Sequence, residues 1–431
     1  MAANVTKTGK AEGEALMSAR CFECSSLRDY DKEAGSRLVD AVKGDRVSVA
    51  FSLRLEAAEE ELRTRVLENA QIRVMIAASE RQNTHDNSVY VGEPGLAYYL
   101  ARAGLKGEAR SLMDARAGRG GGEGDAALSC SALCGATGVD YVGAYAAEDA
   151  EGFAARCRPV LSRVAVACSR ALEADEWLYG RAGFLRALLG LRRMARKWRL
   201  ADFEHALDGA VSKVVERIVA SGKSDGDAVL RYRWHGTPYL GAAHGTAGIV
   251  YVLLRASEGN AALRAAVLPH VRATLDALVA TEQDHRNYPA AAGEADAPLV
   301  HFCHGAPGMV FALAEGAKVF KDPGLRNAAL RAAETTWRFG LLKKGPGLCH
   351  GIAGNGYALL AAYKLTRDVK WLHRACVFAD DASDDNVVMR CRLPDHPVSL
   401  FEGIAGTACF LRDLVDGPLL AELPFFEFAS G

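Results

Sequence analysis

Residues 347–365, GLCHGIAGNGYALLAAYKL, contain the motif that predicts the fold of the chain. A Cys-His pair, Cys349 and His350, leads into a G-x-x-G turn and then into an apolar run with a helical pattern. The same order occurs 46 residues earlier, where Cys303 and His304 precede the turn and the run MVFALAEGAKVF. A cysteine and a histidine duplicated at equivalent positions indicate a site built between two neighbouring repeats.

The G-x-x-G turn occurs seven times, with first glycines between 43 and 65 residues apart. These first glycines are Gly92, Gly135, Gly180, Gly245, Gly305, Gly351 and Gly403. One such turn carries almost no information, but seven at this spacing, each followed by an apolar run, indicate a repeat architecture. Each interval has room for two helices, which predicts one helical hairpin per repeat.

The paired glycines and the apolar runs together predict the fold. Glycine allows a positive φ angle or a close backbone approach, so the chain can turn sharply into the next helix. A single hairpin cannot bury its apolar face, so the repeats are expected to stack. Runs that follow the glycines, such as AGIVYVLLRA, are more apolar than intervening segments such as AALRAAVLPHVRATLDALVA. We therefore predict an all-α protein, an α/α toroid whose seven helical hairpins form a double-layered barrel with apolar inner helices.

Composition places the chain among globular proteins. Its 431 residues are 50% hydrophobic and carry a net charge of −1, so no global basic field favours nucleic acid. The N-terminus lacks a signal-peptide core, and no stretch approaches the roughly 20 apolar residues that span a bilayer; peripheral membrane contact stays open. Eleven scattered cysteines are not typical of a disulfide framework, so we predict a cytoplasmic location and metal or thiol chemistry for clustered cysteines.

We predict an N-terminal arm over residues 1–36 and one toroid domain over residues 37–431. The arm is polar and irregular, and its lone C-x-x-C pair, Cys21 with Cys24, is weak evidence for zinc or redox chemistry. A second irregular stretch, SGKSDGDAVLRYRWHGTPYLG at residues 221–241, does not indicate a domain boundary.

The residues just before each turn locate the candidate site, because equivalent turns of a ring face one central region. Two of the later turns carry Cys303, His304, Cys349 and His350. Two thiolates and two imidazoles suit zinc. Four ligands would make a closed structural site, whereas three ligands and water would leave a reactive position. The competing interpretation is a pair of buried free cysteines with histidines that cap helices.

Other ionisable residues near these turns are candidates for acid–base chemistry or ligand binding. His244 occupies the matching place in AAHG and titrates near neutral pH, or else it bonds the backbone at a helix start. Glu176 and Glu402 are acid–base candidates or carboxylates at the positive ends of helices. The basic segments 343–344 and 390–395 could bind a carboxylate-bearing small molecule or form solvated surface.

The repeat heads resemble those of the LanC-like family, eukaryotic relatives of bacterial lanthionine cyclases. The resemblance lies in YLGAAHGTAGIVYVL, VHFCHGAPGMVFAL, KKGPGLCHGIAGNGYALL and SLFEGIAGTACFL, with YGRAGFLRALL upstream, and covers the chain from about residue 90. It implies a seven-hairpin toroid with one zinc ion held by two cysteines, one histidine and water. The implied ligands are Cys303, Cys349 and His350, which leaves His304 outside, and His244 matches the family histidine proposed to move protons.

The resemblance to the eukaryotic branch implies an enzyme that adds glutathione to dehydrated serine or threonine, that is, dehydroalanine or dehydrobutyrine, in proteins. The glutathione contacts that it implies are Lys344, Arg392 with Asp395, and Arg20 near the N-terminus. Bacterial cyclases carry an arginine four residues before the first zinc cysteine. This chain has Leu299 there, which fits the eukaryotic branch.

The implied chemistry is Michael addition of a thiol. Zinc lowers the pKa of a thiol that it binds, and the resulting enolate then needs a proton at its α-carbon. His244 is the first candidate for the proton donor and Glu176 the second.

Two other functions remain open on the sequence alone. A zinc-dependent prenyltransferase-type toroid would be expected to use an aspartate ligand and an aromatic-lined lumen, whereas this chain offers a second cysteine and 8% aromatic residues. A non-catalytic adaptor that binds glutathione or another small molecule around a structural zinc needs the same ligands as the enzyme.

Overall fold

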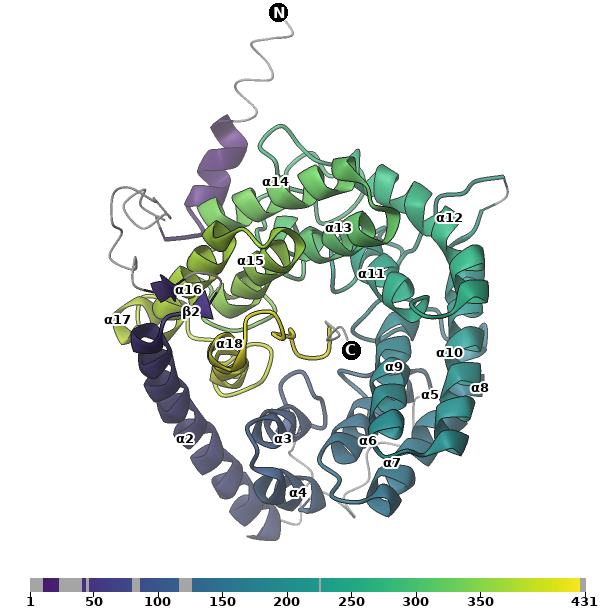
Figure 1. Cartoon of the computed structure of the whole chain (residues 1–431), viewed down its shortest axis with the longest axis vertical. Helices are drawn as coiled ribbons and strands as arrows, with labels where there is room; N and C mark the ends of the chain where they lie inside the picture. The colour runs from purple at the N-terminus through teal and green to yellow at the C-terminus, as the bar shows by residue number, and fades with distance from the viewer. Residues whose placement is uncertain are drawn as a thin grey trace, which may run out of the picture.

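Helices make up almost all of the regular structure and are arranged as a two-layered ring (Figure 1). The computed structural model describes residues 11–22, 41–43, 46–79, 86–115, 126–224 and 226–426, with the backbone alone over 72–79. The ring surrounds a central region into which the last of the described residues run. The predicted all-α toroid is confirmed.

Inner helices surround the centre, and outer helices cover them (Figure 1). The inner helices are α3 (Glu93–Arg102), α6 (Ala136–Tyr145), α9 (Arg181–Lys197), α11 (Thr246–Ala256), α13 (Ala306–Phe320), α15 (Ile352–Thr366) and α18 (Ile404–Asp416). The outer helices are α2 (Val49–Ser79), α4 (Lys106–Asp114), α7 (Ala150–Ser162), α10 (Ala201–Gly222), α12 (Ala261–Val279), α14 (Pro323–Phe339) and α16 (Val369–Ser383). Shorter elements are α5 (Ala126–Ser129), α8 (Val164–Cys168), α17 (Asp385–Val388) and the antiparallel strands β1 (Val42–Lys43) and β2 (Arg46–Val47). Residues 11–18 form a further helix.

Burial distinguishes the two layers in the predicted way. Inner helix α11 buries every residue except Arg255. Outer helix α12 buries a stripe that includes Leu263, Val267, Val271 and Leu275, four residues apart. Residues at this spacing lie on one face of a helix, so α12 packs that face against the inner layer.

Hydrogen bonds, all but one of them between backbone groups, join the seven turns into a circle. The N–H of Cys303 donates to the carbonyl of Cys349 (3.1 Å), and the N–H of Cys349 donates to the carbonyl of Phe401 (2.9 Å). The other links, donor first, are Trp177 to Ala243, Ala243 to Cys303, Phe401 to Tyr90, Tyr90 to Leu133 and the Ser131 hydroxyl to Leu178. Corresponding residues of successive repeats therefore lie side by side, which is why the two cysteines are neighbours.

Both ends of the chain take part in closing the ring. Helix α18 packs against α15 and α3, and Arg102 on α3 pairs with Asp413 on α18 at 2.6 Å. Its outer partner is α2, which comes from the N-terminal part of the chain (Figure 1). The C-terminal tail enters the centre, where Phe425 and Phe426 are fully buried and the Phe425 carbonyl accepts a hydrogen bond from the Trp177 indole (2.9 Å).

The second glycine of each turn is required by close packing. A Cβ added there would lie 1.7–2.3 Å from the carbonyl oxygen of the residue six positions earlier in all seven turns. Examples are Gly248 against Ala242 and Gly354 against Leu348. The first glycines have extended backbone except Gly305, whose φ is 103°. The predicted close approach is confirmed, whereas positive φ is needed at only one of the first glycines.

We expect Gly248→Ala to lower the free energy of unfolding by about 1–3 kcal/mol, the usual cost of overpacking an interior. The new methyl group would meet the Ala242 carbonyl oxygen at 2.0 Å, so the start of α11 has to shift. Gly209→Ala is the matched control, because Gly209 lies in α10 with open space around it and alanine there should stabilise the helix by about 0.5–1 kcal/mol. Chemical denaturation measures both effects, and equal stability of the two variants would contradict this role.

The N-terminal segment over residues 11–22 packs against the ring. Met17 is buried in a small cluster that includes Phe339 at the end of α14. Cys24 and most of the predicted arm (1–36) lie outside the described residues, so the C-x-x-C pair and the boundary of the arm stay predictions.

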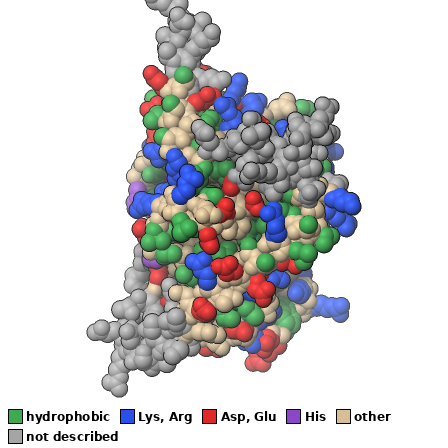
Figure 2. Space-filling view, turned by 90° about the vertical axis from the view of Figure 1, so that its left-hand side faces the viewer, with side chains coloured by type: hydrophobic (Ala, Val, Ile, Leu, Met, Phe, Trp, Pro, Cys, Tyr) green, Lys and Arg blue, Asp and Glu red, His purple; other side chains and the backbone are tan. Residues whose placement is uncertain are grey.

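The outer surface carries charges of both signs. On the face shown in Figure 2, Lys and Arg side chains are interspersed with Asp and Glu side chains. In the part of the chain that the structure describes, every helix is too short or too polar to cross a bilayer.

Candidate metal centre and its surroundings

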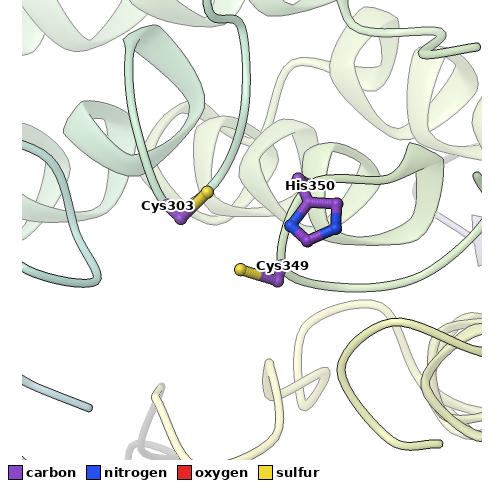
Figure 3. Close-up of side chains that lie close together, drawn as sticks. All are labelled: Cys303, Cys349 and His350. Atoms are coloured by element: carbon purple, nitrogen blue, oxygen red, sulfur yellow. The ribbon is translucent and has the colours of Figure 1, made fainter. Parts of the chain in front are cut away.

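Two cysteines and one histidine meet at the starts of α13 and α15. The potential ligand atoms of Cys303, Cys349 and His350 all lie within 4.8 Å of one another (Figure 3). Each residue precedes the first glycine of its turn, and the circle of backbone bonds places the two cysteines side by side. The structure therefore brings the three predicted zinc ligands together.

The donor set fits zinc. Both cysteines are buried, and two thiols with one imidazole are donors that zinc prefers. His304 lies outside this group of ligand atoms, and its ring instead faces His244, with the ring centroids 6.1 Å apart. The geometry favours three protein ligands, the arrangement that leaves one position for a substrate.

Hydrogen bonds prepare Cys349 to be the thiolate of the pair. A hydrogen bond from Cys303, together with bonds from His350 and Tyr90, lowers the pKa of the Cys349 thiol well below its usual range despite burial. The same shared bond and burial raise the pKa of Cys303. Because the thiolate is the form that binds metals, one cysteine of the pair is already suited to that role.

Tyr90 is a part of the site that the sequence analysis missed. Its hydroxyl hydrogen-bonds Cys349, and its ring stacks on Phe401 with 5.1 Å between centroids. Burial and the two thiols raise the pKa of Tyr90, so the hydroxyl keeps its proton and donates a hydrogen bond to Cys349. The sequence does place Tyr90 at the repeat position of Cys303 and Cys349. A tyrosine at such a position is, however, also typical of the apolar core, so the position alone did not indicate a role in the site.

His244 and Glu176 form a pair at the starts of α11 and α9. Nδ1 of His244 lies 2.9 Å from Oε2 of Glu176, and the glutamate is only 2% exposed. Glu176 also accepts hydrogen bonds from the N–H groups of Leu178 and Tyr179. The carboxylate thus stabilises its own turn and orients the histidine, whose Nε2 is left as the nitrogen available for proton exchange.

A pocket with charges of both signs opens beside the metal ligands. Its free space, including the solvent at its mouth, is about 560 Å³, and its polar lining side chains are Lys344, His350, Arg392, Asp395 and Glu402. Arg392 and Asp395 are exposed, with 3.8 Å between their charged atoms. The N–H of Arg392 donates to the carbonyl of Lys343 (2.7 Å), which fixes this loop against the segment before α15. Three of the predicted glutathione contacts therefore share a pocket with one predicted zinc ligand.

Arg20, the fourth predicted contact, approaches the same region from the N-terminal segment. Its backbone carbonyl accepts a hydrogen bond from the N–H of Lys343 (3.1 Å). Burial lowers the pKa of the neighbouring His301 to about 2, and the charges of Lys344 and Arg20 add to this effect. Arg20 does not line the 560 Å³ pocket itself.

The sequence model of the lanthionine synthetase C-like proteins matches residues 83–428 of this chain. The chain belongs to this family. The matched region contains all seven glycine turns and the three clustered metal-binding side chains.

Curated relatives of this LanC-like protein come from animals and plants. Glutathione S-transferase LANCL1 of Danio rerio is 39% identical over 260 residues, which are 59% of this chain and 62% of that protein. LanC-like protein GCL1 of Arabidopsis thaliana is 39% identical over 259 residues, which are 58% of this chain and 57% of that protein. The chain thus matches less than two thirds of the length of either relative.

A solved structure with the same fold is that of nisin cyclase. It aligns with a TM-score of 0.61 at 15% identity, covering 81% of this LanC-like protein and 93% of that chain. At this identity the likeness establishes the shared toroid fold alone.

Proposed function

We propose that this LanC-like protein adds glutathione to dehydroalanine and dehydrobutyrine residues of proteins and so forms a thioether. The observation that carries the proposal is that His350 belongs both to the cluster with Cys303 and Cys349 and to the pocket with Lys344 and Arg392. A thiol-activating centre next to a pocket that holds Lys344 and Arg392 suits a small thiol that bears carboxylates. The name of the Danio rerio relative, a glutathione S-transferase, supports glutathione as that thiol.

Cys303, Cys349 and His350 would hold one zinc ion. The chemistry that zinc supplies when bound is to lower the pKa of a thiol, so that the thiolate is present at neutral pH. Tyr90, through its hydrogen bond to Cys349, would keep that ligand in position.

The proton of the reaction is assigned to His244. The thiol first loses its proton to solvent and becomes a thiolate. Addition then forms a C–S bond at the β-carbon, breaks the π bond of C=C as its electrons move toward the carbonyl to give an enolate, and ends with a proton on the α-carbon. We assign delivery of that proton to Nε2 of His244, since Glu176 holds Nδ1. The contact with Glu176 also holds the imidazole ring in one orientation.

The pocket carries charges of both signs, as glutathione does. Glutathione carries two carboxylates and one ammonium group. Arg392 can hold a carboxylate through two parallel N–H groups, and Lys344 can hold the other as a point charge. Asp395 supplies the negative charge that the ammonium group requires. Arg20, which does not line the pocket, would add a cation from the N-terminal segment bonded to Lys343.

Lys344→Ala and Arg392→Ala are each expected to weaken glutathione binding by about 1–3 kcal/mol, the range for charge-assisted hydrogen bonds. Calorimetric titration with glutathione measures the effect. Lys197→Ala, an exposed lysine in the last turn of α9, is the matched control and should bind as the unmodified protein does. Unchanged affinity in both pocket variants would contradict the assignment.

The proposed function is tested by an addition assay on the unmodified protein. Mass spectrometry should detect glutathione joined to a dehydroalanine peptide faster than in the uncatalysed reaction, with about one zinc ion per chain measured on the same sample. Glutathione binding without any such acceleration would instead establish the non-catalytic adaptor.

The ten cysteines of the described residues are all free thiols, in keeping with the reducing cytoplasm that we propose as the location.

A further inference from the structure

Three aromatic side chains surround the ring of His244. The indole of Trp234 stacks on the imidazole with 4.1 Å between centroids and 4° between planes. Tyr179 is nearly parallel to the imidazole at 6.3 Å, and Tyr239 is tilted at 5.9 Å. All of these rings are partly exposed, so the group is accessible from outside the apolar core.

A short hairpin in the irregular 221–241 stretch presents two of the rings. Trp234 and Thr237 exchange both of their backbone hydrogen bonds (3.0 Å each), and the two residues between them have φ angles of 47° and 77°. Positive φ at both central positions is the type I′ turn that suits two-residue hairpins. Tyr239 then pairs with Ala291, which anchors the base of the hairpin. Trp234 is therefore held against His244 by a defined backbone structure.

The aromatic group extends to His304, next in sequence to one of the predicted zinc ligands. The ring of Tyr239 lies 5.6 Å from that of His304, the residue that follows Cys303. Nδ1 of His304 is buried and has no hydrogen-bond partner among the described residues. A buried nitrogen of this kind is normally satisfied by water or by a bound molecule.

The two sides of the centre differ in chemistry. Along the ring, the starts of α9 and α11 carry the aromatic group, those of α13 and α15 carry the cysteines, and the pocket toward α18 carries Lys344 and Arg392. A thiol that bears carboxylates and an ammonium group suits the side with charges of both signs. The second reactant has to meet the same sulfur, and the aromatic side is the one that carries His244.

We propose that Trp234, Tyr179 and Tyr239 form the subsite for the acceptor, the dehydroamino-acid residue of a peptide. This inference rests on the proposed function. The C=C and C=O groups of a dehydroamino acid are conjugated, planar and uncharged, which suits contact with flat aromatic faces. A saturated residue has a tetrahedral α-carbon and stacks less well, so the subsite selects for the unsaturated residue itself.

Tryptophan fluorescence tests acceptor binding without turnover. Titration of the zinc-loaded protein, with no glutathione present, with a dehydroalanine peptide should quench the emission of Trp234. The matching alanine peptide should need about three- to tenfold higher concentrations. Trp234→Phe should remove the quenching, whereas Trp198→Phe, which replaces another partly exposed tryptophan at the end of α9, should retain it. Quenching that persists in Trp234→Phe would overturn the subsite.

Steady-state kinetics test the same subsite in the reaction. Trp234→Ala should raise the KM for the dehydroalanine peptide about three- to tenfold, with zinc content and glutathione affinity unchanged, and Trp234→Phe should restore most of the loss. If the KM for the dehydroalanine peptide stays unchanged, even where kcat falls, the result contradicts a role of Trp234 in acceptor binding. If the dehydroalanine peptide quenches Trp234 but no glutathione is added to it, the proposed function is refuted and the subsite is supported. If glutathione is added but no quenching depends on Trp234, the subsite is refuted and the proposed function is supported.

Discussion

Cys349→Ala is expected to lose the bound zinc completely while the helical content of the protein stays unchanged. The two remaining ligands, Cys303 and His350, fall short of the three protein ligands that even an open zinc site uses. The ring should persist, because residue 349 enters the circle of turns through its backbone and the inner helices bury one another. Glutathione addition should fall to the uncatalysed rate. Elemental analysis and circular dichroism on one sample measure metal and fold together.

Cys376→Ala provides the matched control for this experiment. Cys376 is fully buried on the outer helix α16, away from the metal-binding cluster, and burial raises the pKa of its thiol. This variant should keep its zinc even if it loses some stability. Full metal occupancy in Cys349→Ala would rule out the assigned ligand set.

His244→Ala is expected to keep zinc and glutathione but to lose about 10²–10⁴-fold in the rate of addition, the usual contribution of a positioned acid. The residue makes its hydrogen bond to Glu176 and not to the metal-binding cluster, so its removal should leave the thiol side of the site intact. Single-turnover measurements isolate the chemical step from product release. His205→Ala, an exposed histidine on α10, is the matched control and should react at the unmodified rate.

Other results for His244→Ala would identify other roles. If the rate survives and the free energy of unfolding falls by about 1 kcal/mol, the histidine only supports the start of α11, as a capping residue does. If neither the unmodified protein nor the variant accelerates addition, the protein is an adaptor. Melting curves and zinc content measured on the same samples distinguish these results.

The sequence by itself determined the ring and the position of the metal centre. Both depend on local signals, because each glycine turn and the helix after it form within one repeat and neighbouring repeats meet at a constant register. From that register the sequence predicts that Cys303 and Cys349 are neighbours, and the structure confirms their proximity. The family resemblance separated His350, which joins the cluster, from His304, which does not.

The tertiary structure alone decided how the ring closes and what surrounds the centre. Helix α2 covers α18, although the two lie at opposite ends of the chain, and no periodic pattern encodes such a pairing. Tyr90 reaches Cys349 because the first and last repeats meet at that closure. Trp234 reaches His244 because an irregular loop folds back as a hairpin, and Glu176 reaches it from the preceding repeat. Each contact joins residues separated by long or irregular stretches of chain, so it follows from packing of the whole ring and not from local sequence.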